Sequence, residues 1–277
     1  MTGVLRRMLR NRRWRYGVIL LAVLGALAAL APALAPYNPT AQLGVASQLL
    51  PPSATHPFGT DTFGRDVLSR VIYGARISFL IALFSVLLSV TIGTGVGIAA
   101  GYGSRILDGL IMRTVDTALA VPRVFLLLLV LALWERVDVT SLIIILGSTS
   151  WFGVSRIVRA EVLSVRERSY MEAARALGAG RRRILLHHLL PNVLTPVIVA
   201  ATLGMGNIVL TEAGLSFLGL GIQEPTASLG RMMQAGSSLL VNAPWTSIFP
   251  GIIIVLTVIG FSLVGDGFRE TLDPRTA

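Results

Sequence analysis

Long stretches without a single charged side chain constrain this sequence more than any other feature. The two clearest are residues 17–36 and 77–100. Each is long enough, as an α-helix, to cross the ~30 Å hydrocarbon core of a bilayer. Hydrophobic residues make up 53% of the chain and charged residues only 14%, whereas soluble domains contain about 25% charged residues. The chain is therefore predicted to fold in lipid rather than in water.

Four further apolar segments bring the predicted number of membrane spans to six. They are residues 121–134, 139–154, 191–210 and 248–264. An amphipathic stretch from Ile106 leads into the first of these four, and Pro122 is placed to kink or start it. The predicted fold is all-α and polytopic. Residues 1–76 would form an N-terminal cytoplasmic arm, the first helix and an outer loop, and residues 77–277 the other five helices.

All 24 basic residues are arginine, and they are distributed unevenly along the chain. With six alternating spans, eighteen arginines fall on one side of the membrane, five on the other, and Arg123 inside the third span. Because arginine-rich loops stay in the cytoplasm during insertion, both termini are predicted to be cytoplasmic. This pattern explains the +10 net charge better than nucleic-acid binding does. A cleaved signal peptide is the less favoured interpretation of residues 17–36, because its apolar core would be shorter.

Two missing residue types limit the chemistry of the chain. Without cysteine there is no disulfide, thiol nucleophile or zinc thiolate site. Without lysine there is no GxxxxGK[ST] nucleotide-binding loop, so any ATP chemistry must belong to another polypeptide. The carboxylates are scattered, and the adjacent His187 and His188 would point to different faces of a helix. The chain is predicted to have no catalytic, cofactor-binding or metal-binding residues, and not to be an enzyme.

The passage YMEAARALGAGRRRILLHHLLPN, residues 170–192, is unusually polar for this chain. Gly178 and Gly180 favour two short helices, because glycine ends a helix without a side-chain penalty. The first helix carries a small apolar patch with one acidic and one basic neighbour: Ala173, Ala174, Leu177, Glu172 and Arg175. The second carries an inner stripe of Ile184, Leu185, His188 and Leu189. From the residues alone, the patch suits a groove in a partner protein and lipid headgroups equally well.

The spacing within this passage resembles the EAA loop of bacterial ABC importer permeases. Glu172, Ala173 and Ala174 are followed by Gly178, and then by Leu190 and Pro191; His188 replaces the usual isoleucine. Three other stretches are similar to the second permease subunit of dipeptide, oligopeptide and nickel importers: HPFGTDTFGRDVLSRVIYGARISF at 56–79, EAGLSFLGLGIQEPTASLGRMM at 212–233 and GDGFRETLDPR at 265–275.

Two positions depart from this resemblance. Glu224 stands where proline is common, and Leu229 where tryptophan is common. Both are expected on the outer side, where they could alter contact with a binding protein or the entry of substrate.

The resemblance implies a multi-pass permease subunit of an ATP-driven importer in the bacterial plasma membrane. Its expected partners are a homologous second permease subunit, two ATP-binding subunits that hold ATP and Mg²⁺, and an extracytoplasmic substrate-binding protein. The implied ATPase-coupling residues are Glu172, Ala173, Ala174, Leu177, Gly178, Leu190 and Pro191. The cargo stays open among dipeptides, longer peptides, glutathione, nickel chelates and related solutes. A secondary transporter or channel subunit is the alternative, because six spans alone suit either class.

Four polar residues within the spans are candidates for a translocation pathway. Arg123 is the foremost, because a guanidinium at membrane depth is costly unless it faces protein, water or a counter-charge. It could attract a peptide carboxylate, pair with Asp116, or extend to the inner interface, which is slightly favoured. The others lie near the outer end of the fifth span and could instead only bridge helices: Asn207, Thr211 and Glu212.

Two further features concern packing. Gly93, Gly97 and Gly101 recur every four residues, which predicts the close approach of another helix. Residues 37–76 are rich in proline and glycine and then offer Val67 and Val71 on one helical face. We expect an outer loop followed by an interfacial helix.

Overall fold

The computed structural model describes residues 7–134 and 136–272 of the chain. Within these ranges the secondary structure is helical and contains no β-strand, which confirms the predicted all-α class. The elements, in order, are α2 (Arg12–Ala29), α3 (Ala31–Leu34), η1 (Val45–Ser47), α4 (Val67–Tyr102), α5 (Arg105–Ala120), α6 (Arg123–Ala132), α7 (Val139–Arg166), α8 (Ser169–Ala176), α9 (Arg181–Arg183), the π-helix η2 (Ile184–Leu189), α10 (Leu190–Phe217), α11 (Leu229–Ser237) and α12 (Trp245–Leu272).

Four helices among the described residues are long and apolar enough to cross a membrane. They are α4, α7, the continuous helix from Arg181 to Phe217, and α12. The pair α5 and α6 adds a fifth span if its two halves are counted together; they are bent by 81° at Val121 and Pro122. The predicted kink at Pro122 is therefore confirmed.

The first predicted span, residues 17–36, is divided between α2 and α3 and is not among these four or five. The helix α2 begins at Arg12, so its first turns also contain Arg13 and Arg15, and it ends at Ala29. Its uncharged part is thus shorter than the uncharged run in the sequence. The structure supports four or five of the six predicted spans.

The expectation of an interfacial helix after the outer loop is wrong. Val67 and Val71 belong to the first turns of α4, which continues without interruption to Tyr102. Their side chains are 0% and 3% exposed, and they join the main hydrophobic core rather than a lipid surface. The apolar face was correctly located in the sequence, but it packs on protein.

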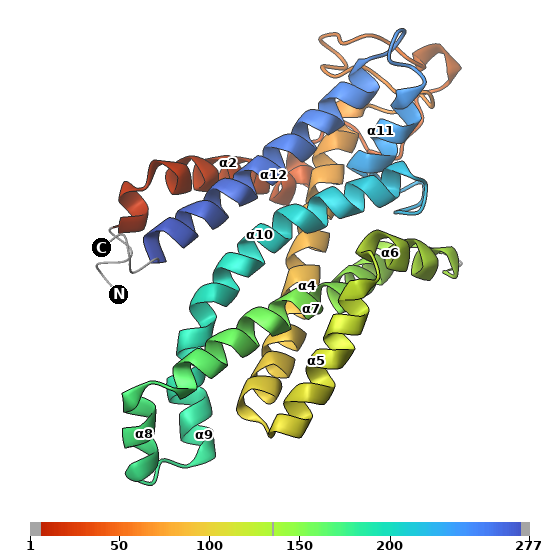
Figure 1. Ribbon diagram of the computed structural model, residues 1–277. Helices are drawn as coiled ribbons and strands as arrows, with labels where there is room; N and C mark the ends of the chain where they lie inside the picture. The colour runs from red at the N-terminus through yellow and green to blue at the C-terminus, as the bar shows by residue number, and fades with distance from the viewer. Residues whose placement is uncertain (1–6, 135, 273–277) are drawn as a thin grey trace.

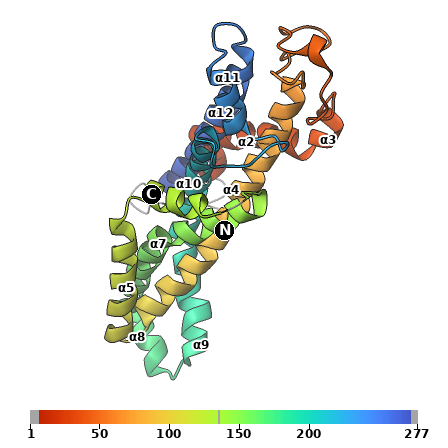
Figure 2. The same ribbon diagram turned by 90° about the vertical axis from the view of Figure 1, so that its right-hand side faces the viewer.

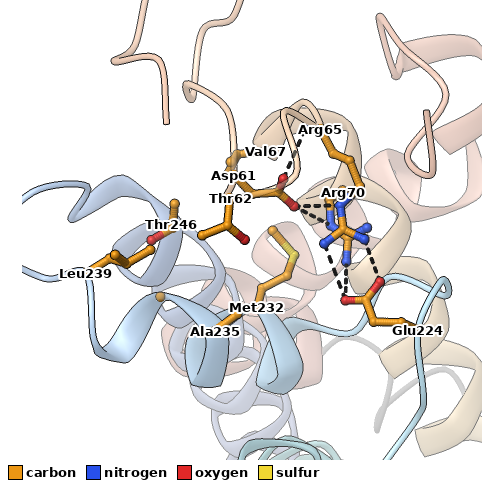
Figure 3. A pocket seen from close by; sticks show the side chains of 11 residues that line it. Asp61, Thr62, Arg65, Val67, Arg70, Glu224, Met232, Ala235, Leu239 and Thr246 are labelled. Carbon is orange, nitrogen blue, oxygen red and sulfur yellow. Dashed lines mark hydrogen bonds and ion pairs between the residues drawn. The ribbon is translucent and has the colours of Figure 1, made fainter. Parts of the chain in front are cut away.

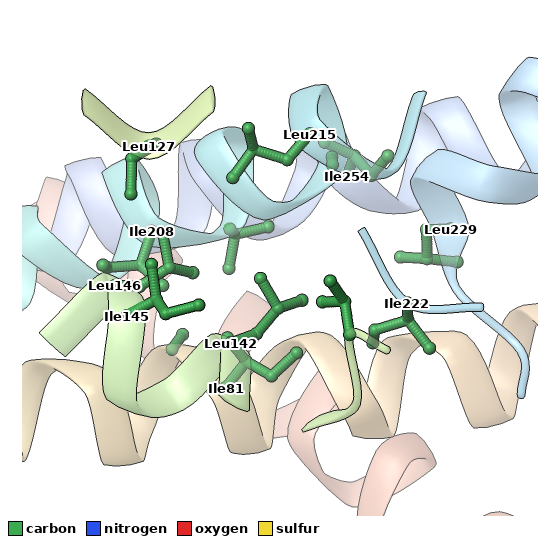
Figure 4. Packing of buried hydrophobic residues seen from close by; sticks show 14 of the residues in the cluster. Ile81, Leu127, Leu142, Ile145, Leu146, Ile208, Leu215, Ile222, Leu229 and Ile254 are labelled. Atoms are coloured by element: carbon green, nitrogen blue, oxygen red, sulfur yellow. The ribbon is translucent and has the colours of Figure 1, made fainter. Parts of the chain in front are cut away.

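The main core lies where α4, α6, α7, α10, α11 and α12 meet. Figure 4 shows Ile81 of α4, Leu142 of α7 and Ile208 of α10 among its members. The two helices α4 and α7 approach closely along the glycine stripe. A Cβ atom on Gly97 would lie 2.6 Å from the carbonyl oxygen of Ser155, so no larger side chain fits there. The predicted close approach is confirmed.

The loop formed by α8 and α9 projects from one end of the bundle, and the outer loop with α11 lies at the opposite end (Figures 1 and 2). The helix α2 runs along α12, where Trp14 packs edge-on against Phe268 and Arg13 pairs with Glu270. The ends of the two helices therefore lie together. Arg6 and Arg275, which entered the predicted charge asymmetry, lie outside the described residues.

Candidate functional site

The helix α8 ends as its sequence predicts. Gly178 has a φ of +79°, in the left-handed region that residues with a side chain rarely adopt. Its backbone N–H donates to the carbonyl of Arg175 at 2.9 Å, and that of Ala179 to the carbonyl of Ala174 at 3.0 Å. These bonds satisfy carbonyl groups at the end of the helix and turn the chain sharply toward α9.

The outer face of α8 is uncovered among the described residues. Leu177 is 88% exposed, Ala173 and Glu172 are exposed, and Ala174 is half-buried. Covering a leucine this exposed with another surface would lower the free energy, because its apolar side chain would be removed from water. The structure thus places the predicted apolar patch where a partner can reach it.

The opposite face of α8 is anchored in a second, smaller core. Met171 is fully buried and packs with Ile184, Leu189 and the three valines at the end of α7, Val158, Val162 and Val165. Met171 was not among the predicted site residues. Its position two residues before Ala173, on roughly the opposite side of the helix, is the sequence signal that could have identified it.

The second helix of the loop is not a separate short helix. It continues from α9 through η2 into α10, so that one helix runs from Arg181 to Phe217. Pro191 lies in the first turn of α10, at the predicted start of a span. Ile184 and Leu189 are buried, and Leu185 and His188 are partly buried, as the predicted inner stripe requires. The second half of the loop and a membrane span are therefore one continuous helix.

Arg123 lines a cavity of about 280 Å³ between α4, α7 and α10. Its Nη2 donates to Ser150 Oγ at 2.6 Å. The predicted pairing with Asp116 is wrong, because Asp116 lies 3.9 Å from the Nε of Arg156 and forms no ion pair with Arg123 in the described chain. Asn207 lines the same cavity from α10.

A second cavity of about 820 Å³ adjoins the first, and Ile157, Ala200 and Leu203 line both. It extends along α7 and α10 to Pro191 and also includes Arg269 of α12. The two cavities therefore neighbour each other along α7 and α10, one beside Arg123 and the other reaching Pro191 near the α8 loop.

The other two pathway candidates have partners within the protein. Thr211 Oγ1 donates to the backbone carbonyl of Asn207 at 2.7 Å. Glu212 is completely buried, and its carboxylate accepts hydrogen bonds of 2.9–3.0 Å from three serines, Ser78, Ser216 and Ser228. Glu212 therefore joins α4, α10 and the start of α11, which is the helix-bridging alternative expected for it, and it does not face an entrance.

The outer motif of residues 56–79 forms a compact, hydrogen-bonded loop at the start of α4. Asp66 caps α4 by accepting from the N–H of Ser69 at 2.8 Å, and it also contacts His56 Nδ1 at 2.9 Å. Beside it, the guanidinium groups of Arg65 and Arg70 both reach the carboxylate of Glu224 (Figure 3). Burial opposes the charge of Arg65, but hydrogen bonds to Glu224 and Asp61 prevail and raise its pKa.

The two departures from the family pattern differ in their positions. Glu224 links the loop before α11 to the outer motif, and its side chain is 35% exposed. Leu229 is only 1% exposed. It packs against Gly74 of α4, where an added Cβ would lie 3.0 Å from its Cδ2. Leu229 lies at the end of the bundle that carries the outer loop, but its side chain is not free to contact a binding protein, because the first turn of α11 packs into the core.

An all-helical bundle with an exposed, anchored loop and two neighbouring open cavities fits a polytopic membrane transport protein. Comparison with known proteins specifies it further. A family model described as "Binding-protein-dependent transport system inner membrane component" matches residues 93–277, and one described as "N-terminal TM domain of oligopeptide transport permease C" matches residues 1–52.

Similar proteins include the dipeptide transport system permease protein DppC of Alkalihalophilus pseudofirmus, 41% identical over 96% of this chain and 87% of that protein. A putative peptide permease of Brucella suis is 41% identical over 97% of this chain and 89% of its own length. A putative peptide transport system permease of Brucella abortus is 41% identical over 98% and 90%, respectively.

The chain belongs to the family of binding-protein-dependent transport system inner membrane components. It is a permease subunit of an ABC importer, which is not itself an enzyme; ATP hydrolysis lies in separate subunits. The alternative of a secondary transporter or channel subunit is set aside by this membership.

Proposed function

We propose that this permease imports short peptides or a closely related small solute delivered by an extracytoplasmic binding protein. The relatives support this cargo class, because their names describe dipeptide and peptide permeases. In this proposal the chain pairs with a homologous permease, and two ATP-binding subunits hold ATP and Mg²⁺. Both termini and α8 face the cytoplasm of a bacterial cell, as the arginine distribution favours.

The exposed face of α8 is the observation that carries the coupling part of the proposal. Its small side chains allow a close fit, and Leu177 supplies an apolar anchor at the tip. The buried Met171 on the other side holds α8 rigidly to α7. This combination of a rigid support and an uncovered apolar tip suits a docking element for an ATP-binding subunit better than a lipid anchor.

The helix from Arg181 to Phe217 provides the route from this docking element to the transport pathway. Its cytoplasmic end forms half of the loop, and its middle, including Ala200 and Asn207, lines the cavity beside Arg123. Movement of the docked loop would therefore change the distance between α7 and α10. Alternating access requires such a link between ATPase closure and the pathway. Arg123 and Asn207, which line this cavity, are the residues we assign to the pathway.

The coupling assignment is tested by Leu177→Ala in the assembled transporter. We expect ATP-driven uptake to fall about tenfold, because burial of a leucine contributes about 1.5–3 kcal/mol to docking. The measurement is peptide uptake together with ATP hydrolysis by the copurified complex. Membrane insertion should not change, since Leu177 contributes nothing to the core.

Leu133→Ala is the matched control. Leu133 is 79% exposed, similar to Leu177, but lies just beyond the far end of α6. Its replacement should leave uptake and hydrolysis near the wild-type values. Normal uptake by Leu177→Ala, or an equal loss in both variants, would refute the docking role.

A further inference from the structure

Arg123 lies at a break in a membrane span. It is the first residue of α6, directly after the 81° bend that separates α6 from α5. Pro122, at the cap position, makes no side-chain hydrogen bond to the helix. The N-terminus of a helix carries a partial positive charge from its unpaired backbone N–H groups. The charged guanidinium therefore belongs to the residue that forms the positive end of α6.

The charge of Arg123 has no counter-charge within the described chain. Its Nη2 donates to Ser150 Oγ, and its Nε is buried without a hydrogen-bond partner. Ser150 is neutral and donates its own proton to the carbonyl of Leu146. In residues 7–134 and 136–272, no carboxylate lies within ion-pair distance of Arg123. Arg123 is partly buried, and a cation with a buried, unpartnered N–H and no counter-charge is costly unless an anion completes the site.

The cavity beside Arg123 has the size and lining of a small-solute site. Its volume is about 280 Å³, and the hydroxyl of Ser89 and the amide of Asn207 line it together with apolar side chains such as Val86, Val154 and Ile208. This lining suits a ligand with one anionic end, hydrogen-bonding amide groups and an apolar part. Three of its lining residues also line the larger cavity that reaches Pro191: Ile157, Ala200 and Leu203.

We propose that Arg123 and the start of α6 form a carboxylate subsite that receives the C-terminal carboxylate of a transported peptide. The inference rests on the proposed function, because it assigns the recognised group to the same transport cavity. Broken membrane helices often direct their N-termini at anionic substrate groups. Arg123 adds a planar donor fork that matches a carboxylate. The subsite selects for a free carboxylate during translocation, after the binding protein has made its own selection.

The test compares a short peptide with a free C-terminal carboxylate and the same peptide as its C-terminal amide. Uptake of both is measured with the complete transporter in proteoliposomes, for the wild type and for Arg123→Gln. The same binding protein serves both proteins, so its selectivity cancels when the acid-to-amide uptake ratios are compared. We expect Arg123→Gln to lower this ratio by at least about tenfold, since hydrogen bonds to a charged group are lost. Arg123→Lys, which keeps the charge, should restore most of it.

Arg113→Gln is the matched control, because Arg113 is an exposed arginine on α5, in the other half of the same broken span. It should leave the ratio unchanged. An unaltered ratio in Arg123→Gln, or an equal loss of both substrates, would overturn the subsite. If Arg123→Gln does not assemble, Arg123→Met removes the charge with an apolar side chain and gives the same comparison. Failure of the proposed function would give a different result from failure of the subsite. In that case, wild-type uptake of both peptides would be independent of ATP.

Discussion

At the scale of single residues, Glu224 shows how one side chain can connect distant parts of the chain. It lies before α11, yet its carboxylate reaches Arg65 and Arg70, more than 150 positions earlier. Arg70 is 1% exposed and depends on Glu224 and the more distant Asp61 for charge compensation (Figure 3). Removing one partner of a buried ion pair is costly because the other charge stays buried. Glu224 therefore stabilises the outer end of the bundle.

Replacing Glu224 by glutamine should destabilise the protein by about 1–2 kcal/mol, a value reduced from that of fully buried pairs because Glu224 is partly exposed. The measurement is the thermal unfolding midpoint in detergent. Glu161→Gln is the control, since its side chain is 29% exposed and its contact with Arg168 is 3.8 Å long. Equal shifts of the midpoint in the two variants would contradict the stabilising role of Glu224.

The sequence located several of these residues but not their partners. Glu212 was recognised as a polar residue near the outer end of a span, yet nothing in a linear pattern shows that three serines from three helices converge on it. Met171 was missed for a related reason. Its importance depends on the valines of α7 that surround it. Periodicity identifies the face of a helix, and only the assembled bundle shows what that face meets.

At the scale of helices, the pairing of α4 with α7 depends on the absence of side chains. An added Cβ on Gly93 would lie 2.7 Å from the Cβ of Val154, and one on Gly101 2.8 Å from that of Val162. These distances are too short for carbon atoms in contact, so the two helices must separate if the glycines are replaced. Because α7 also supports Met171, the position of the α8 loop depends on this contact.

Gly97→Val should disrupt the α4–α7 contact and cost about 1–3 kcal/mol through overpacking. The measurement is again the unfolding midpoint, together with accessibility of the α8 loop to protease. Gly95→Val is the control, because Gly95 lies on the same helix with no atom within 4 Å of an added Cβ. A Gly97 variant as stable as the Gly95 variant would argue against tight packing along this stripe.

Most helices could be predicted from their apolar runs, but their ends could not. The break at Pro122 followed from the geometry of proline, which fixes its own φ and lacks an N–H. The start of α4 at Val67 and the continuation of α9 into α10 could not be predicted from the sequence. In both cases a polar or short segment was separated from the adjoining span, because hydropathy marks the region that lipid covers and not the length of a helix.

At the scale of the whole molecule, the bundle has one stabilised end, which carries α11 and the loop before α4, and an exposed α8 loop at the other end, joined by long helices. The ion pairs of Glu224 and the serines around Glu212 tie the outer helices together. At the other end, α8 is fixed on one face and uncovered on the other. The cavities beside Arg123 lie between these ends. This arrangement suits a subunit that moves in response to a partner bound at its loop.

The exposed face of α8 is proposed to meet an ATP-binding subunit. The chain has no cysteine, so a single Leu177→Cys substitution gives one defined crosslinking position. In membranes containing the assembled, uptake-competent transporter, a short thiol-to-amine crosslinker should join this position to an ATP-binding subunit, whereas Leu133→Cys should give no such product. Crosslinking from Leu133→Cys but not Leu177→Cys, or labelling of Leu177→Cys by an impermeant reagent outside the cell, would contradict the account.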